Sequence, residues 1–324
     1  MKNTIAFVLD GKVVEVGFDA SSKLTPTTTV LNYLRSLPGH RGTKEGCAEG
    51  DCGACTVVLG EAAAGGRITY RAVDSCLLFL PMLHGKQLIT VENLKDPNGN
   101  LHPIQQALVD FHGSQCGFCT PGIVMSLFAL WKTVDQASWD EAATALAGNL
   151  CRCTGYRPIL QAAVEACRSG RIDQFAKEEQ RTITTLASIS RESISIDIRG
   201  QRYDQPVSLD ECLTLLERHP SAIVVNGATD VALSVTRKFE VLPHVLDCSR
   251  VADLQSTRRN DGGLTIGAGV RLADLLPVVA SEYPALHQML TVFGAQQIRN
   301  TATIGGNLGT ASPVGDLLPV LTAY

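Results

Sequence analysis

Three cysteines and three glycines occupy twelve positions near the N-terminus, in the stretch GCAEGDCGACTV at residues 46–57. Glycine gives up side-chain bulk and accepts positive φ, so this stretch is predicted to be a tightly wrapped loop. A fourth cysteine, Cys76, follows after twenty further residues. Four thiols gathered around one tight loop indicate a metal site, and no other feature constrains the first part of the chain as strongly.

Length and charge limit the class of protein. The chain has 324 residues, which suits two or three domains, and its formal net charge of -4 offers no basic field for nucleic acid. No stretch approaches 18 uninterrupted apolar residues, and the N-terminal stretch meets Asp10 too early to be a secretory signal. We therefore expect a soluble cytoplasmic protein that binds neither nucleic acid nor a membrane.

The chain has eleven cysteines, and a reducing cytoplasm does not maintain structural disulfides. Thiolates that bind metal are the better explanation for most of them. Three stand alone and are predicted to be small core residues, namely Cys167, Cys212 and Cys248. The other eight form two sets, the first made of Cys47, Cys52, Cys55 and Cys76 and the second of Cys116, Cys119, Cys151 and Cys153.

The first set has the CxxxxCxxC spacing of plant-type ferredoxins, which hold a [2Fe–2S] cluster. A zinc site is the alternative, but zinc loops usually pair one CxxC with another. We expect Gly46, Gly50 and Gly53 to take positive φ, so that backbone N–H groups point at sulfur. A hairpin turning at Asp10-Gly11, a helix over 28–36 and a strand at CTVVLG complete a ferredoxin-like β-grasp pattern.

The second set combines CxxC with CxC, separated by 31 residues. Apolar residues at helical spacing predict four helices around it, with Pro121 in the first turn of one of them. Four short helices would form a bundle, with the cysteine pairs on the turns. Spacing alone leaves an iron–sulfur cluster and zinc both open for this set.

After the second cysteine set, the sequence pattern changes at two points. Residues 171–196 are polar and are predicted to be a linker. After Asp197, short strands and helices alternate as in an α/β domain, with Ser208 as the N-cap of one helix. A strand, a glycine turn and a helix are predicted in the stretch AIVVNGATDVALSVT. Many small hydrogen-bonding residues lie close together in IRNTATIGGNLGTASPVGDLLPVL, and they suit a flat polar ligand. The predicted domains are 1–90, 91–170, the linker 171–196, and 197–324.

The cysteines of both sets lie in four motifs, TKEGCAEGDCGACTVVL, DSCLLFL, QCGFCTPGIVMS and GNLCRCTGYRPI. Together these motifs resemble the iron–sulfur module of the molybdenum hydroxylases, the family of xanthine dehydrogenase, aldehyde oxidase and carbon monoxide dehydrogenase. The resemblance implies that both cysteine sets bind [2Fe–2S] clusters. It places the first cluster nearer a flavin and the second nearer a molybdenum cofactor held by another domain or subunit. It also implies that Gln115 lies close to the pterin of that cofactor.

The last part of the chain resembles the FAD domain of the same family, the molybdopterin dehydrogenase type. That domain usually shows Gly-Gly-x-Thr-Asp in its first loop, where this chain has Asn226 for the first glycine. Asn tolerates the left-handed region, so FAD binding is compatible with the change. Because the family domain extends beyond the position of Tyr324, we expect an incomplete N-terminal part, in which FAD occupancy is left open. By position, the FAD-binding residues would be Val225, Gly227, Ala228, Thr229, Asp230, Val231, Phe293, Thr303, Gly306, Asn307, Thr310 and Asp316.

The resemblance therefore implies an α+β multidomain electron-transfer subunit of the xanthine dehydrogenase type, with no catalytic residue for substrate in this chain. Its expected partner is a large subunit carrying molybdenum-molybdopterin, in a heterotetramer or higher hetero-oligomer, with NAD as electron acceptor and xanthine or hypoxanthine as substrate. Two alternatives stay open. One is a subunit of an aldehyde oxidase or N-heterocycle dehydrogenase, and the other is a non-catalytic metal-binding electron-transfer protein.

Overall fold

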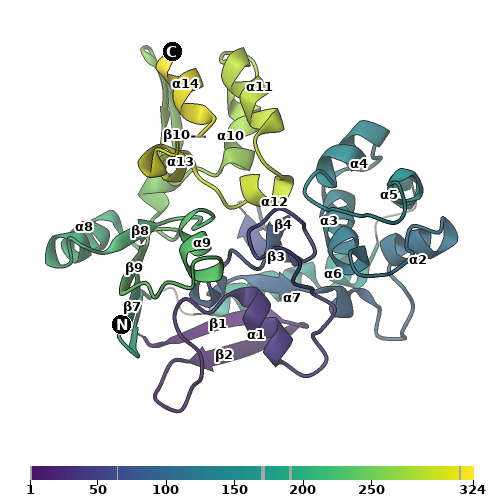
Figure 1. The fold of residues 1–324 in the computed structure, drawn as a ribbon, viewed down its shortest axis with the longest axis horizontal. Coiled ribbons are helices and arrows are strands. Elements are labelled where there is room, and N and C mark those ends of the chain that lie inside the picture. The colour runs from purple at the N-terminus through teal and green to yellow at the C-terminus, as the bar shows by residue number, and fades with distance from the viewer. Residues whose placement is uncertain (1, 64, 169–171, 190–191, 314) are drawn as a thin grey trace.

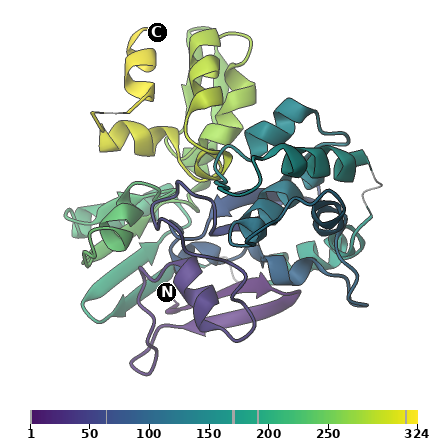
Figure 2. The ribbon, with the colours of Figure 1, turned by 45° about the vertical axis from the view of Figure 1, so that its right-hand side comes forward.

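The computed structural model describes residues 2–63, 65–168, 172–189, 192–313 and 315–324, and in it three parts of the chain pack against one another (Figure 1). An N-terminal sheet forms the base and a helical bundle lies beside it. The C-terminal part stands against both, as the turned view shows (Figure 2). In the described part of the chain, no helix is both long enough and apolar enough to cross a bilayer.

The N-terminal part is a five-stranded mixed sheet in the order β2-β1-β5-β3-β4, with α1 packed on it. The predicted hairpin is confirmed, because Asp10 and Gly11 turn it with φ of 52° and 72°. The predicted helix is confirmed as well, and the Thr29 side chain caps it by accepting from the Asn32 N–H. The elements are β1 (Thr4–Leu9), β2 (Lys12–Gly17), α1 (Val30–Ser36), β3 (Thr56–Ala63), β4 (Arg67–Asp74) and β5 (Gln87–Ile89).

The four helices predicted around the second cysteine set are all present. They are α2 (Pro103–Asp110), α3 (Thr120–Thr133), α4 (Trp139–Ala145) and α5 (Arg157–Arg168). Pro121 lies in the first turn of α3, where its missing N–H costs no helical hydrogen bond. The bundle encloses its own apolar core around Phe128 and Trp131, and the cysteine pairs lie on the turns between helices, as predicted.

The segment predicted to be a linker is structured where it is described. Residues 171 and 190–191 lie outside the described residues, but the rest holds α6 (Gln174–Lys177) and α7 (Glu179–Ser188) before β6 begins at Ile194. The stretch was expected to be a polar linker, but it packs on its neighbours, because Phe175 and Leu186 are buried against the bundle and the sheet. Two apolar residues spaced this far apart hold both short helices, although the composition around them is polar.

The C-terminal part has two layers. Its lower layer is a four-stranded sheet in the order β6-β7-β9-β8, in which β7, β9 and β8 run parallel. Above it, a two-stranded hairpin and several helices surround a separate apolar core (Figure 1). Ser208 caps α8 as predicted, accepting from the Glu211 N–H. The strands are β6 (Ile194–Ile198), β7 (Gln201–Gln205), β8 (Ile223–Val225), β9 (His244–Asp247), β10 (Thr257–Asn260) and β11 (Gly263–Ile266).

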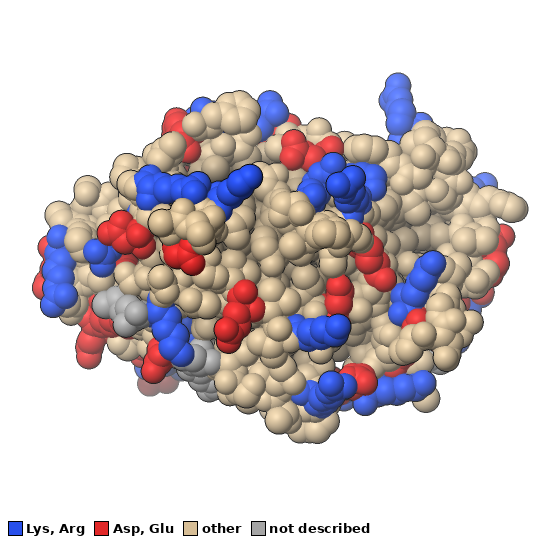
Figure 3. All heavy atoms as spheres, turned by 90° about the horizontal axis from the view of Figure 1, so that it is seen from below, with Lys and Arg blue, Asp and Glu red and all other residues tan. Residues whose placement is uncertain are grey.

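The predicted strand-turn-helix order holds for the two helices that follow β8 and β11, whereas the last helices succeed one another with no strand between them in the described residues. The helices of the C-terminal part are α8 (Leu209–Arg218), α9 (Val231–Thr236), α10 (Leu272–Val279), α11 (Pro284–Val292), α12 (Gln296–Arg299), α13 (Ile304–Thr310) and α14 (Leu317–Thr322). In the described residues, short 3₁₀ helices lie at Leu80–Leu83, Val91–Leu94 and Ala252–Gln255. On the face seen from below, basic and acidic side chains are interspersed over the surface (Figure 3).

A charged cluster joins the N-terminal sheet to the C-terminal part. Glu61 on β3 accepts two hydrogen bonds from Arg271, at 2.6 and 2.8 Å, and also pairs with Lys86 at 3.2 Å and Arg71 at 3.8 Å. Its side chain is only 20% exposed. Burial opposes ionisation of Glu61, but the facing cations Lys86, Arg271 and Arg71 hold its pKa well below its usual value.

Replacing Glu61 by Gln removes the carboxylate shared by Lys86, Arg271 and Arg71, although Asp274 still pairs with Arg71, so we expect the free energy of unfolding to fall by about 2 kcal/mol or more at neutral pH. Because the folded pKa is depressed, the carboxylate stabilises the fold above the unfolded pKa of about 4.3, and this stabilisation is lost as the pH falls through the folded pKa. Urea unfolding at several pH values measures both effects. The control is Glu165→Gln, which removes an exposed ion pair with Arg168 and should change stability by less than about 0.5 kcal/mol.

Candidate cofactor sites

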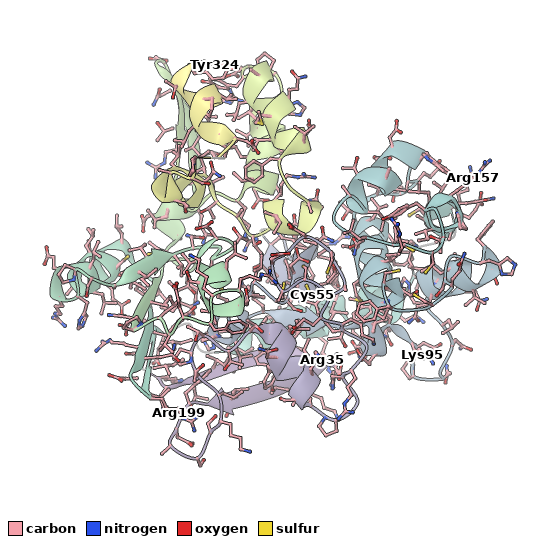
Figure 4. All side chains as sticks on the ribbon, viewed as in Figure 1. Arg35, Cys55, Lys95, Arg157, Arg199 and Tyr324 are labelled. Carbon is pink, nitrogen blue, oxygen red and sulfur yellow. The ribbon has the colours of Figure 1, made fainter. Side chains whose placement is uncertain are left out.

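The first cysteine set is assembled by strand pairing. Thr56 at the start of β3 pairs with Asp74 at the end of β4. Cys55, one residue before this pair, and Cys76, two residues after it, therefore meet with their Sγ atoms 3.4 Å apart. Cys47 and Cys52 form a second pair through a side-chain hydrogen bond. Cys55 lies near the centre of the molecule, where the sheet, the bundle and the C-terminal part meet (Figure 4).

Backbone N–H groups around this loop point at sulfur. The Glu49 N–H donates to Cys47 Sγ at 3.4 Å, and the Ala54 backbone donates to the sulfur of Cys52. Gly50 and Gly53 have the predicted positive φ, at 85° and 65°. Gly46 does not, and the expectation for it is wrong. Its absent side chain serves a different purpose, because a Cβ there would lie 2.7 Å from Cys52 Sγ.

Two thiols of the first set, those of Cys52 and Cys55, have raised pKa values and so resist ionisation. Burial raises the pKa of Cys52, and the hydrogen bond to Cys76 together with burial raises the pKa of Cys55 well above its usual value. Burial also raises the pKa of Asp74 to about 7, and its carboxylate lies 3.4 Å from Cys55 Sγ. Binding of iron therefore has to release protons from this pocket.

The second set also divides into two pairs. Side-chain hydrogen bonds join Cys116 to Cys153 and Cys119 to Cys151. The backbone N–H of Phe118 and the Cys153 thiol lower the pKa of Cys116, whereas burial and the bond to Cys151 raise the pKa of Cys119 to about 12. Cys116 and Cys153 are exposed, so one pair faces outward and the other inward.

A [2Fe–2S] cluster takes its four thiolates two to each iron. Both cysteine sets match that division, because each consists of two sulfur pairs. Among the described residues, no group of three or more His, Cys, Asp or Glu side chains is arranged to hold a single metal ion. The eight cysteines thus fit the cluster chemically, and their assignment as iron ligands stays a prediction.

The loops that carry the two sets are hydrogen-bonded to each other. The Leu150 N–H, one residue before Cys151, donates to the carbonyl oxygen of Cys52 at 3.0 Å. On the other side of the first loop, Arg237 at the end of α9 donates to the Cys47 carbonyl at 3.2 Å and pairs with Glu49 at 3.1 Å. The first loop is therefore held between the bundle and the C-terminal part.

The two segments predicted to bind FAD come together. The first runs from Val225 at the end of β8 into α9, and a Cβ on Gly227 would lie only 1.8 Å from the carbonyl oxygen of Thr301. Glycine at 227 is therefore what allows this loop to touch the chain leading into α13. The left-handed residue of the loop is Ala228, with φ of 57°. Asn226 is not among the residues with positive φ, so its proposed role as a left-handed substitute for glycine is wrong.

The second segment retains unused hydrogen-bonding capacity. Thr303 caps α13 by accepting from the Gly306 N–H at 3.1 Å, and Asn307 Oδ1 is buried without a hydrogen-bond partner in the described structure. Gly306 and Thr310 are exposed beside it. Phe293 packs on the apolar core that contains Ile304. An orphaned acceptor next to small exposed residues fits a polar ligand such as FAD.

The remaining predicted FAD residues lie around these two loops. Thr229 and Val231 are partly buried at the start of α9, and Asp230 and Asp316 are exposed. Gln115 is exposed next to Cys116. Beside it, an apolar groove of about 520 Å³ runs between α2 and α3, lined by Leu108, Val109 and Val124 among others.

Sequence reasoning missed a group of buried polar side chains between the three parts of the chain. Gln297, Asn149, Ser126 and Thr56 are at most 2% exposed and hydrogen-bond to one another. The run AQQIRN was the available signal, because it places polar residues directly before a predicted ligand loop. The three solitary cysteines are buried as predicted, and Cys212 Sγ lies 3.3 Å from Cys248 Sγ.

Comparison with known proteins identifies two of the three parts. Residues 90–164 match the family model described as a [2Fe-2S] binding domain, and residues 196–324 match the FAD binding domain in molybdopterin dehydrogenase. The chain is therefore an iron–sulfur flavoprotein by class. These two cofactors are the ones to which the cysteine pairs and the paired loops are suited.

Curated relatives extend the match over nearly the whole chain. Xanthine dehydrogenase of Drosophila subobscura is 34% identical over 371 residues, and aldehyde oxidase 3 of Mus musculus is 32% identical over 369 residues. These alignments cover 99% and 98% of this chain but 27% of each relative. A solved chain of quinoline 2-oxidoreductase from Pseudomonas putida 86 is 30% identical, with 55% of this chain and 96% of that chain covered and a TM-score of 0.42.

The chain belongs to the molybdenum hydroxylase family of xanthine dehydrogenases and aldehyde oxidases, and it corresponds to the electron-transfer region with iron–sulfur and FAD domains. It spans about a quarter of the length of the curated relatives it matches. Members of this family are oxidoreductases with separate or fused molybdopterin-binding parts.

Gly53→Ala tests the loop contact. The new Cβ would combine positive φ with an approach of 2.3 Å to the Gly148 carbonyl oxygen, so we expect a loss of stability above about 2 kcal/mol and a lower iron content per chain. Thermal unfolding and iron analysis measure the two effects. Gly65→Ala is the control, because its φ is 90° but nothing lies within 4 Å of the new Cβ, so iron content should stay unchanged.

Proposed function

We propose that this chain is the electron-transfer subunit of a xanthine dehydrogenase. It would bind two [2Fe–2S] clusters, at Cys47, Cys52, Cys55 and Cys76 and at Cys116, Cys119, Cys151 and Cys153, and FAD between the 225–231 loop and α13. When bound, the clusters supply one-electron steps and the flavin a two-electron step, which links a molybdenum centre in a partner subunit to NAD.

One observation carries the proposal more than any other. The loop of the first cysteine set is bonded on one side to the loop of the second, through the Leu150 N–H and the Cys52 carbonyl, and on the other side to α9, which follows the proposed FAD loop. The three proposed cofactor sites are therefore consecutive neighbours in space. Such an order suits single electrons entering at one end and leaving in pairs at the other.

The residues of this chain have distinct tasks in that scheme. Backbone N–H groups of Glu49 and Ala54 stabilise anionic sulfur in the first set, and burial of Cys55 excludes water from it. Thr303 orders the turn into α13, and Asn307 offers a buried acceptor there. Substrate chemistry is assigned to the partner in this proposal.

The partner is proposed to be a large molybdopterin-binding subunit in a hetero-oligomer. The outward pair Cys116 and Cys153, the exposed Gln115 and the apolar groove between α2 and α3 lie on one side of the bundle. An apolar groove next to exposed cluster ligands is a suitable contact surface for the subunit that delivers electrons.

The substrate is the most specific element of the proposal. Xanthine dehydrogenases match this chain at 32–35% identity, but aldehyde oxidases match it at 32–34%, so an aldehyde or an N-heterocycle is the second candidate. Turnover of xanthine, an aldehyde and quinoline by the purified complex, followed as NAD reduction, distinguishes these cases. A chain that contains iron but forms no complex and supports no turnover would instead be a separate electron carrier.

Cys119→Ser should remove about half of the iron and one of two cluster EPR signals, and it should stop substrate-driven NAD reduction in the complex. The signal of the first set should persist, because its ligands lie on another domain. Cys212→Ala is the matched control, since Cys212 is a buried cysteine outside both sets and its loss should leave iron content intact. Undiminished NAD reduction in Cys119→Ser would contradict the relay.

A further inference from the structure

Gln297 on α12 is completely buried at the junction of all three parts of the chain. Its side-chain amide lies within hydrogen-bond distance of three acceptors. These are Asn149 Oδ1 at 2.9 Å, Ser126 Oγ at 3.1 Å and Thr56 Oγ1 at 3.3 Å. Thr56 begins β3 of the sheet, and Ser126 and Asn149 belong to the bundle. One side chain of the FAD-binding part therefore bonds to both cysteine-bearing domains.

Asn149 completes the network. Its Oδ1 also accepts from the Ser126 hydroxyl at 2.6 Å, and its amide donates to the Gly53 carbonyl at 3.1 Å and to Thr56 Oγ1 at 3.2 Å. All hydrogen-bonding positions of the Asn149 side chain are therefore used. Asn149 lies two residues before Cys151, and Gly53 lies between Cys52 and Cys55. The network thus touches the loops of both cysteine sets.

The chain segments around the network are too closely packed to accept an added Cβ at Gly122 or Gly148. A Cβ on Gly122 would lie 2.1 Å from the Gly53 carbonyl oxygen, and a Cβ on Gly148 would lie 2.4 Å from Cβ of Ala295 and 2.5 Å from Gln297 Oε1. The backbones of the first cysteine loop and the bundle are in direct contact, and side chains of α12 and Ala295 lie against Gly148. A small shift of one part against another would therefore break several directional hydrogen bonds at once.

The same short helix is tied to the proposed FAD site. Arg299 donates to the carbonyls of Phe293 and Gly294 at 2.8 and 2.9 Å, and the Asn300 amide donates to the Ala72 carbonyl on β4 at 2.8 Å. Thr303, which caps α13, follows three residues later. The position of α12 therefore sets the position of the loop that leads into the flavin segment.

We propose that Gln297 is a positioning residue for electron transfer, fixing the separation of the two cysteine loops from each other and from the FAD-binding loops. This inference rests on the proposed function. Apolar contacts would hold the parts together without fixing their register, whereas buried hydrogen bonds are directional and are costly to leave unmade. The network therefore selects one relative placement of the three proposed cofactor sites.

The test uses Gln297→Leu in the purified full chain with its iron. Loss of the amide leaves Asn149, Ser126 and Thr56 short of a partner, so the junction should open more often. The Leu150 amide, which bonds to the Cys52 carbonyl, should exchange its hydrogen about tenfold faster. The magnetic interaction between the two reduced clusters, seen as splitting of their EPR signals, should weaken or broaden. Gln288→Leu is the matched control, because Gln288 is exposed on α11.

Ser126→Ala provides a milder variant if Gln297→Leu does not fold. It removes one hydroxyl from the network and should change the same two readouts in the same direction by a smaller factor. A lower melting temperature with unchanged Leu150 exchange and unchanged splitting would overturn the proposal, since that result marks a merely structural residue. Absence of iron from the wild-type chain would overturn the proposed function instead, while exchange at Leu150 would still report on the junction.

Discussion

The close contact of backbones at Gly53 is the constraint on which the rest of the molecule depends. Gly53 belongs to the first cysteine loop, yet its carbonyl lies against Gly122 of the bundle and accepts from Asn149. No residue with a side chain fits there, because the position combines positive φ with neighbours closer than a Cβ allows. Two domains that would otherwise pack through side chains are thereby joined backbone to backbone.

The sequence patterns predicted local structure, but they did not predict contacts between domains such as this one. The Asp10-Gly11 turn and the helix over 28–36 are local features, so the sequence predicted both correctly. Helical spacing likewise predicted α2 to α5. Nothing local in the sequence, however, indicates that Gln297 would meet Asn149 across 148 positions, because such a contact is decided by the packing of three domains.

The errors have the same origin. The segment 171–196 is polar in composition, but the bundle and the sheet offer places for Phe175 and Leu186, and tertiary contacts stabilise helices that composition does not favour. In the FAD loop, the family motif directed attention to Asn226, whereas the backbone takes its left-handed turn at Ala228. A motif compares residue types, and it does not say which residue of a turn takes positive φ.

The difference in exposure between the two cysteine sets has a consequence for how the protein matures. Cys55 and Cys76 are each 2% exposed, whereas Cys116 and Cys153 lie on the surface. Because Cys55 and Cys76 are covered in the folded chain, iron would reach these two thiols more readily before the surrounding domains close, which would tie their loading to folding. Cys116 and Cys153 stay accessible in the folded chain. Biogenesis would therefore run in a fixed order, from the inside outward.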